Sequence, residues 1–225
     1  MKERRNNMQN YPLQEQDIKI RRLTGEEILG IYTTHSTRHF PKDEQKPISS
    51  LRRMLADGIY IGYGFYPGKE PDQLLGYAFF TVLPDKSSCL LDYFAVMEDY
   101  RSHGIGSLFL QHIKSFFQDI PGFLIESEDP DYAGNTSEYS IRRKRLDFYK
   151  RNGAVFTGIR TTVFNVPYRL LFFPLRDNFA RKEKEEYPLE TIHASYCSIY
   201  RRMVSPEDYE TQIHISLEET CAAKP

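Results

Sequence analysis

The chain has 225 residues, of which 40% are hydrophobic, 14% aromatic and 27% charged. At roughly 150 residues per domain this length fits one or two domains, and the apolar content suffices for a core without disulfides or structural metals. Lys and Arg number 30 and Asp and Glu number 31, giving a formal net charge of −1. This balance disfavours both a globally basic nucleic-acid binder and an acidic disordered chain.

The cysteines and the apolar runs indicate the compartment. Cys89, Cys197 and Cys221 are far apart and form no CxxC pair, which argues for a reducing environment and against a disulfide framework or a zinc site. No apolar stretch follows the basic residues at the start, so no secretory signal is expected. The longest apolar run, Leu74–Leu83, is about half of a membrane span. We therefore expect a cytoplasmic protein with no metal site and no membrane or nucleic-acid partner.

The first part of the chain predicts one strand and two helices. Residues 1–17 are polar and are expected to be flexible, and alternation over 17–21 predicts a short strand. Thr24-Gly-Glu-Glu27 is a capping box that opens a helix. A loop is expected from His35 to Lys46, after which a second helix extends from Pro47 to the stop at Gly58.

The middle of the chain predicts a mixed α/β fold. Three strands separated by short turns should pair as an antiparallel meander; they cover Ile59–Tyr66, Leu74–Leu83 and Cys89–Val96. The later elements are a helix at Ile105–Phe117, a strand at Phe123–Ser127, a helix at Ser137–Lys150, and strands at Ala154–Val166 and Tyr168–Phe173 separated by Pro167. The resulting order predicts a partly antiparallel mixed sheet with helices.

The composition changes after Pro174, and the last part of the chain is expected to be a linker and a helical C-terminal extension. Charged residues dominate 177–186, apolar residues from Leu189 to Met203 recur at helical spacing, and Ser205 can cap a further short helix. We therefore divide the chain into a flexible N-terminus (1–17), one domain (18–176) and this extension (177–225). The apolar stripe is expected to pack on its own domain. The alternatives are a homodimer interface and a cover over the functional site.

The most informative stretch runs from Leu90 to Leu110. A buried strand leads into a short loop, then Arg101-x-x-Gly104-x-Gly106, then a helix. Glycines allow several backbone N–H groups to converge, and the helix N-terminus adds unpaired N–H groups, so this pattern suits a phosphate or pyrophosphate. A dinucleotide-binding GxGxxG would need glycine where Phe109 stands, and no P-loop string occurs. The alternative is an ordinary glycine-containing turn.

Two motifs carry a resemblance to a known family. The stretch Cys89–Phe117 resembles the acetyl-CoA-binding signature of the GNAT N-acetyltransferase superfamily, in which a hydrophobic strand, here ending at Val96, is followed by about four loop residues and [RQ]xxGx[GA]. The segment Arg143–Gly158 is similar to the superfamily's next motif, where a tyrosine, here Tyr149, stands just before an Asn-Gly turn. The element order from Ile18 to Pro174 also matches. The resemblance implies a GNAT acyl-CoA N-acyltransferase-like fold and acetyl transfer from acetyl-CoA to a primary amine in a ternary complex.

The resemblance also implies where acetyl-CoA binds. Its pyrophosphate is expected on the backbone N–H groups of a turn made by Arg101, Ser102, His103, Gly104, Ile105 and Gly106. Its pantetheine arm is expected to pair like an added strand with the backbone of Phe94, Ala95 and Val96. Tyr149 is expected to protonate the leaving CoA thiolate, the alternative being a packing role. The run Arg142-Arg-Lys-Arg145 covers all sides of a helix and is expected to be solvated.

Acidic residues at the end of the strand Phe123–Ser127 suggest the acceptor site. Glu126 and Glu128 are two apart and therefore point to the same face of the sheet, which in the superfamily faces the acetyl group. Either carboxylate, or a water molecule, could take the proton of the amine. With Asp129 and Asp131 they form either a mouth that attracts a cationic amine or a solvated acidic loop.

These features predict a small cationic amine as the acceptor. His35 and His39 lie in the loop that lines the acceptor pocket in the superfamily, although loop histidines are more often surface residues. No Ser/His/Asp or Cys/His constellation indicates a covalent nucleophile. The alternative functions are acetylation of a protein or peptide amine and, from a different class, a non-catalytic acyl-CoA-binding regulatory module.

Overall fold

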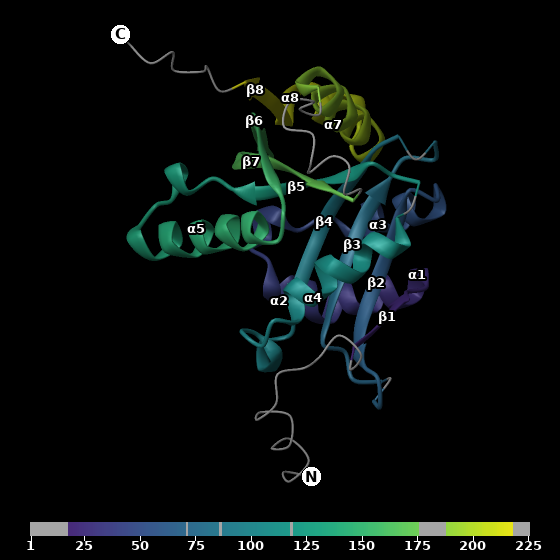
Figure 1. Ribbon diagram of the computed structural model, residues 1–225. Helices are drawn as coiled ribbons and strands as arrows, with labels where there is room; N and C mark the ends of the chain where they lie inside the picture. Colours follow the sequence, from purple (N-terminus) through teal and green to yellow (C-terminus); the bar gives the residue numbers. More distant parts are fainter. Residues whose placement is uncertain (1–17, 71, 86, 118, 176–187, 218–225) are drawn as a thin grey trace.

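The computed structural model describes residues 18–70, 72–85, 87–117, 119–175 and 188–217. Their strands form one mixed sheet in the order β1-β2-β3-β4-β5-β7-β6-β8 (Figure 1). The predicted mixed sheet with helices and a helical C-terminal region is confirmed. The expected flexible N-terminus and the charge-rich linker lie outside the described residues. No helix among the described residues is long and apolar enough to cross a membrane.

Most predicted elements are present with small shifts at their ends. The strands are β1 (Ile18–Arg22), β2 (Tyr60–Pro67), β3 (Gly76–Val82), β4 (Cys89–Val96), β5 (Gly122–Glu128), β6 (Val155–Val163), β7 (Val166–Pro174) and β8 (Ile213–Leu217). The α-helices are α1 (Gly25–Ile31), α2 (Thr37–His39), α3 (Ile48–Ala56), α4 (Ile105–His112), α5 (Thr136–Arg151), α7 (Leu189–Met203) and α8 (Pro206–Gln212). The predicted meander β2–β3–β4 is confirmed, and β5 pairs parallel with β4.

Side-chain caps fix where several helices begin. At α1 the Thr24 hydroxyl accepts from the Glu27 N–H, and the Glu27 carboxylate accepts from the Thr24 N–H, so the predicted capping box is confirmed. Ser205 caps α8 as predicted, accepting from the Asp208 N–H. Asn135 caps α5 in the same way.

The sequence predicted a single loop from His35 to Lys46, and this prediction is wrong. The helix α1 continues into a π-helical turn at Tyr32–Ser36 and then into α2. A 3-10 turn follows at Lys42–Glu44. The reason is that Pro41 is the first residue in this stretch that cannot continue a helix.

Two other boundaries differ from prediction. The break between β6 and β7 falls at Phe164 and Asn165, which both have positive φ, and not at Pro167. Pro167 is tolerated near the start of β7 because a missing N–H costs little there, and its carbonyl accepts from Asp129 N–H. The helix expected over Ile105–Phe117 ends at His112 and continues as a 3-10 turn at Ile113–Phe116.

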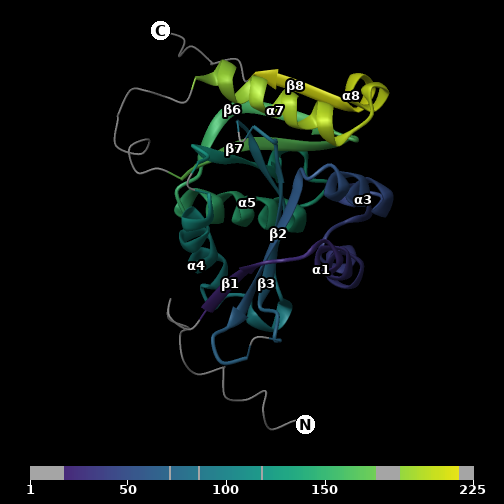
Figure 2. The same cartoon turned by 90° about the vertical axis from the view of Figure 1, so that its right-hand side faces the viewer.

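Helices cover both faces of the sheet. The helices α1 and α3 pack on one face and α4 and α5 on the other, so the sheet is buried on both sides (Figure 2). The two hydrophobic clusters meet along alternate residues of the same strands. On β4, for example, Leu90 belongs to the first cluster and Leu91 to the second.

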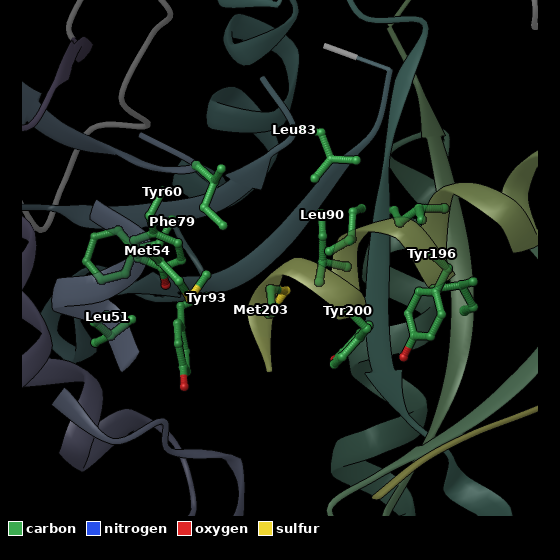
Figure 3. Close-up of a cluster of buried hydrophobic side chains, with 14 of the residues drawn as sticks. Leu51, Met54, Tyr60, Phe79, Leu83, Leu90, Tyr93, Tyr196, Tyr200 and Met203 are labelled. Atoms are coloured by element: carbon green, nitrogen blue, oxygen red, sulfur yellow. The ribbon is translucent and has the colours of Figure 1, made fainter. Parts of the chain in front are cut away.

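The C-terminal extension is part of this core. The predicted stripe on α7 packs against the face that α1 and α3 cover, and Figure 3 shows Tyr196, Tyr200 and Met203 in the same cluster as Leu90. The extension also contains the strand β8, which the sequence analysis missed and which pairs antiparallel with β6. Five residues of alternation, Ile213–Leu217, were too short a signal beside the preceding helix.

Candidate active site

The sheet opens between β4 and β5. These parallel strands pair at only two positions, Leu90 with Leu124 and Leu91 with Ile125, and then diverge (Figure 1). The register of β4 with β3 shifts at the same place, which leaves Asp92 as the extra residue of a β-bulge. The opening is a cavity of about 1120 Å³ whose walls come from β4, β5, α3, α5, α7 and the turn after α2.

The glycine-containing turn lies at the end of β4, next to this cavity. Gly104 is the N-cap of α4 with φ +79°, a left-handed conformation that favours glycine. Ser102 is also left-handed, with φ 67°, and the first turn of α4 contains no acidic residue. The first N–H groups of the helix therefore lie where an anion would be stabilised by them and by the helix dipole.

The second glycine of the motif has a different role. A Cβ on Gly106 would lie 3.1 Å from the ring of Phe148 on α5. Gly106 is therefore required for the close approach of α5 to the start of α4, whereas no atom of the described residues lies within 4 Å of the Cβ position of Gly104. Gly106 thus serves packing, and Gly104 serves the backbone conformation.

The Arg101 side chain holds the turn to the strand. Its Nε donates to the Val96 carbonyl at 3.1 Å, and its guanidinium lies 3.8 Å from the Glu98 carboxylate. The Arg101 side chain therefore has a structural role at the start of the turn. His103 is exposed, with Nδ1 2.7 Å from the Arg101 carbonyl oxygen.

Tyr149 lines the cavity from α5. Burial raises the pKa of Tyr149 to about 12, with nearby Arg145 acting in the opposite direction. The phenol is thus protonated at neutral pH. Its ring lies 6.5 Å from that of Phe94, which also stacks on Phe109 and Phe148. The position combines packing with access to the cavity.

Glu126 also lines the cavity, but its carboxylate already has two donors. The hydroxyls of Tyr196 and Tyr200 on α7 both donate to Oε1, the second at 2.6 Å. Burial raises the pKa of Glu126, and these two hydrogen bonds and Lys46 act in the opposite direction. The C-terminal extension therefore orients this carboxylate.

Glu128 and its acidic neighbours form neither an open acidic mouth nor a merely solvated loop, the two alternatives that the sequence left open, because arginines pair with them. Arg145 and Arg142 lie 2.5 and 3.1 Å from the two carboxylate oxygens of Glu128. Arg160 and Arg169 bind Asp129 in the same way, at 2.6 and 2.9 Å, and both also reach Asp131. The spacing of Arg142 and Arg145 predicted that both would be solvated. Both instead form ion pairs, because Glu128 faces α5.

Glu44 is a cavity residue that the sequence analysis did not single out. It lies in the 3-10 turn after α2, and its Oε1 is buried with no hydrogen-bond partner among the described residues. Burial raises the pKa of Glu44 to about 7; Glu128 adds to this, while Arg145 and a hydrogen bond from Tyr168 oppose it. Glu44 belongs to the loop that lines the acceptor pocket in the superfamily, but the sequence alone does not show which polar residues of this loop face the cavity.

The turn that holds Glu44 is fixed to the sheet. The Tyr93 hydroxyl on β4 donates to the Glu44 carbonyl at 2.7 Å and accepts from the Lys46 N–H at 3.1 Å. The Tyr32 hydroxyl donates to the Lys46 carbonyl at 2.7 Å. Lys46 in turn binds Asp92, the residue at the bulge of β4, at 2.5 Å. Side chains of the sheet thus position the loop opposite the opening.

Of the loop histidines, His39 lines the cavity, and the ring of His35 stacks on the ring of His39. His39 Nδ1 lies 3.0 Å from the Tyr77 hydroxyl, to which the Ser36 hydroxyl donates. Burial lowers the pKa of His39, and Arg101 lowers it further. His39 is therefore a neutral wall residue near the end of β4.

The cavity brings together half of the predicted site residues. Its walls include Phe94, Ala95, Val96, Arg101, Glu126 and Tyr149. The turn from Ser102 to Gly106 adjoins it, and Glu128 lies behind α5 residues. Tyr168 and Tyr200 also line it and were not predicted. They come from β7 and from the extension, whose positions relative to the cavity are set by tertiary packing.

A mixed sheet opened between two parallel strands, with a helix N-terminus beside the opening, is the arrangement expected of the acyl-CoA-dependent acyltransferases that the motifs resemble. Residues 28–132 match the acetyltransferase (GNAT) family. The chain therefore carries a GNAT acetyltransferase domain, and the family resemblance seen in its motifs is confirmed. Enzymes of this family are N-acetyltransferases that use acetyl-CoA. No curated protein matches the chain.

Solved structures show the same fold at low sequence identity. The chain is similar to an N-acetyltransferase from Staphylococcus aureus Mu50, with TM-score 0.50 and 18% identity, covering 70% of this chain and 97% of that one. It is also similar to spermidine N-acetyltransferase from Vibrio cholerae in complex with CoA and spermine (TM-score 0.52, 9% identity, 71% and 96% covered). A third is the ribosomal-protein-S18-alanine N-acetyltransferase from Escherichia coli (TM-score 0.50, 15% identity, 70% and 94% covered).

Proposed function

We propose that the protein transfers the acetyl group of acetyl-CoA to a primary amine of a small cationic molecule, by direct attack in a ternary complex. The observation that carries this proposal is the single cavity that joins the open edge of β4, the side chain of Tyr149 and a wall of acidic and tyrosine side chains. Both reactants would meet there without a covalent enzyme intermediate.

The residues present fit acetyl-CoA. Beyond Leu91 the described part of β4 has no strand partner on the side of β5, so the backbone of Phe94, Ala95 and Val96 offers hydrogen bonds to an amide-containing arm. The turn from Arg101 to Gly106 would hold the pyrophosphate with backbone N–H groups. The bound thioester would supply the activated acetyl group.

The other end of the cavity fits a small cation. Glu44 and Glu126 lie in its walls beside the rings of Tyr168 and Tyr200, and carboxylates with aromatic faces favour ammonium groups. Arg53 of α3 donates to the Met203 carbonyl at the end of α7, which ties two walls of the cavity together. These walls favour a small amine over the amine of a folded protein.

An amine panel tests the proposal. Isothermal titration with acetyl-CoA should show binding, and a thiol-release assay should show turnover with a polyamine but little with a peptide. An aminoglycoside and an amino acid complete the panel. Absence of binding at millimolar acetyl-CoA would overturn the proposal, whereas binding without turnover on any amine would favour the regulatory-module alternative.

Tyr149→Phe should separate chemistry from binding. We expect kcat to fall by ~100-fold, because the leaving thiolate loses a hydrogen-bond donor, while the Kd for acetyl-CoA changes by less than about twofold. Tyr139→Phe, on the exposed part of the same helix, is the matched control. Turnover by Tyr149→Phe equal to that of the wild type would reject the role of the phenol.

A further inference from the structure

We propose that Glu44, and not Glu126 or Glu128, accepts the proton of the attacking ammonium group. This inference rests on the proposed function and names the base that the sequence left open. It assigns a catalytic role to a loop that stands outside both sequence motifs.

Glu44 has the geometry of a proton acceptor. Its side chain lines the cavity that Tyr149 enters from α5 on another wall, and the two side chains interact electrostatically. Its Oε1 has no partner among the described residues. The backbone around it is held by the hydroxyls of Tyr93 and Tyr32, so the carboxylate is placed before a substrate arrives.

The two carboxylates predicted from the sequence are engaged elsewhere. Glu126 accepts hydrogen bonds from two tyrosine hydroxyls at one oxygen, and Lys46 is the nearby cation. Glu128 is 8% exposed and has one arginine on each oxygen. With one arginine on each oxygen, the Glu128 carboxylate is engaged in ion pairs on the side of α5 and has no unpartnered oxygen to offer an ammonium group.

The groups that face Glu44 suit a base at neutral pH. They are Arg145 and Tyr149 from α5, Glu128 from β5, Tyr168 from β7 and Asp43 in its own turn. Burial raises the pKa of Glu44 to about 7, and the Glu128 carboxylate adds to the effect, which Arg145 limits. A base whose pKa lies near the working pH combines ionisation with proton affinity.

The transfer then balances. Glu44 takes one proton from the ammonium group, and the freed amine nitrogen forms a bond to the acetyl carbon as the bond between that carbon and sulfur breaks. A second proton leaves the nitrogen and ends on the sulfur of CoA, where the Tyr149 hydroxyl donates a hydrogen bond. Glu44 releases its proton to solvent, so one acetylated amine, one thiol and one proton are formed.

The kinetic test uses the full chain with the best amine of the panel. For the wild type, kcat/KM should rise with pH to a plateau with an apparent pKa near 7. Glu44→Gln should lower kcat by ~100-fold. It should also abolish this limb of the pH profile, the rise of kcat/KM near pH 7, since only the ionisation of the amine itself then remains. Glu44→Asp should restore part of the rate and the limb. Glu190→Gln, the same substitution at an exposed position of α7 that does not line the cavity, should keep the profile and lie within about threefold of wild type.

A stability measurement gives a readout that does not depend on turnover. The folded protein favours the neutral form of Glu44, because its pKa is raised from the ordinary 4.5 to about 7. Glu44 therefore contributes most to the stability of the folded protein at low pH, and this contribution is lost as the pH rises through 7. Glu44→Gln should match the wild type in Tm at pH 5 and exceed it by about 3 °C or more at pH 8.

The outcomes separate the two proposals. No acetylation of any amine by the wild type would overturn the proposed function. A Glu44→Gln variant that keeps the wild-type rate and the limb near pH 7 would overturn the role of Glu44 and leave the function standing. Equal Tm values at pH 8 would also count against Glu44, because the carboxylate would then ionise without cost in the folded protein.

Discussion

Gly104→Val should raise the Kd for acetyl-CoA by more than ~100-fold while leaving the chain folded. Gly104 has φ +79° at the start of α4, a conformation that a β-branched residue resists at a cost of about 1–2 kcal/mol. No atom of the described residues lies within 4 Å of the position of an added Cβ. The valine side chain would therefore stand in the open space beside the helix N-terminus, where we place the pyrophosphate. Isothermal titration measures the loss.

A second glycine supplies the matched control. Gly58 has φ +70° and likewise has no described atom within 4 Å of its Cβ position, but it lies after α3, away from the turn. Gly58→Val should lose a similar amount of stability to backbone strain and keep its affinity for acetyl-CoA. If both variants bound equally well, the turn at Gly104 would not be the phosphate site.

Ile199→Asp should abolish folding of the protein. Ile199 lies on α7 with no exposed surface and packs in the cluster shared with α1 and α3. An unpaired carboxylate at such a site costs more than about 4 kcal/mol, a large part of the 5–15 kcal/mol that stabilises a typical domain. We expect loss of soluble expression, or a cooperative unfolding transition that disappears from the circular-dichroism melt.

The control for this change is on the same helix. Ala194 is exposed on α7, and Ala194→Asp adds the same charge without burying it, so its effect should stay within about 0.5 kcal/mol. A soluble Ile199→Asp protein with the wild-type Tm would show that α7 does not support the core. Such a result would also remove the basis for its contacts with Glu126.

Local features of the fold could be predicted from the sequence because they depend on neighbours in the chain. The capping box at Thr24 and the cap at Ser205 are examples. The strand, turn and helix around Gly104 are another, since the backbone conformation follows from glycine itself. In each case the residues that decide the structure lie within a few positions of one another.

The interactions of the site depend on tertiary packing and could not be read in the same way. Glu128 was expected to face the acetyl group, but α5 turns two arginines toward it. Glu44 is remote in sequence from Tyr149, and only the opening between β4 and β5 brings the two into one cavity. The strand β8 could not be predicted because its five residues are too few to show a strand pattern. It is a strand because it pairs with β6.

The place of α7 in the core has a consequence for how the protein acquires its structure. The walls of the cavity extend from His39 to Asp208 along the chain, so the site cannot be complete until α7 and α8 have emerged from the ribosome. Until then the apolar side chains that α7 covers, such as Leu124 and Leu170, lack their partner. Domains dominated by such distant contacts fold slowly, and their partly folded forms expose apolar surface. The same arrangement that forms the site therefore leaves apolar surface exposed in forms of the protein in which α7 has not yet docked.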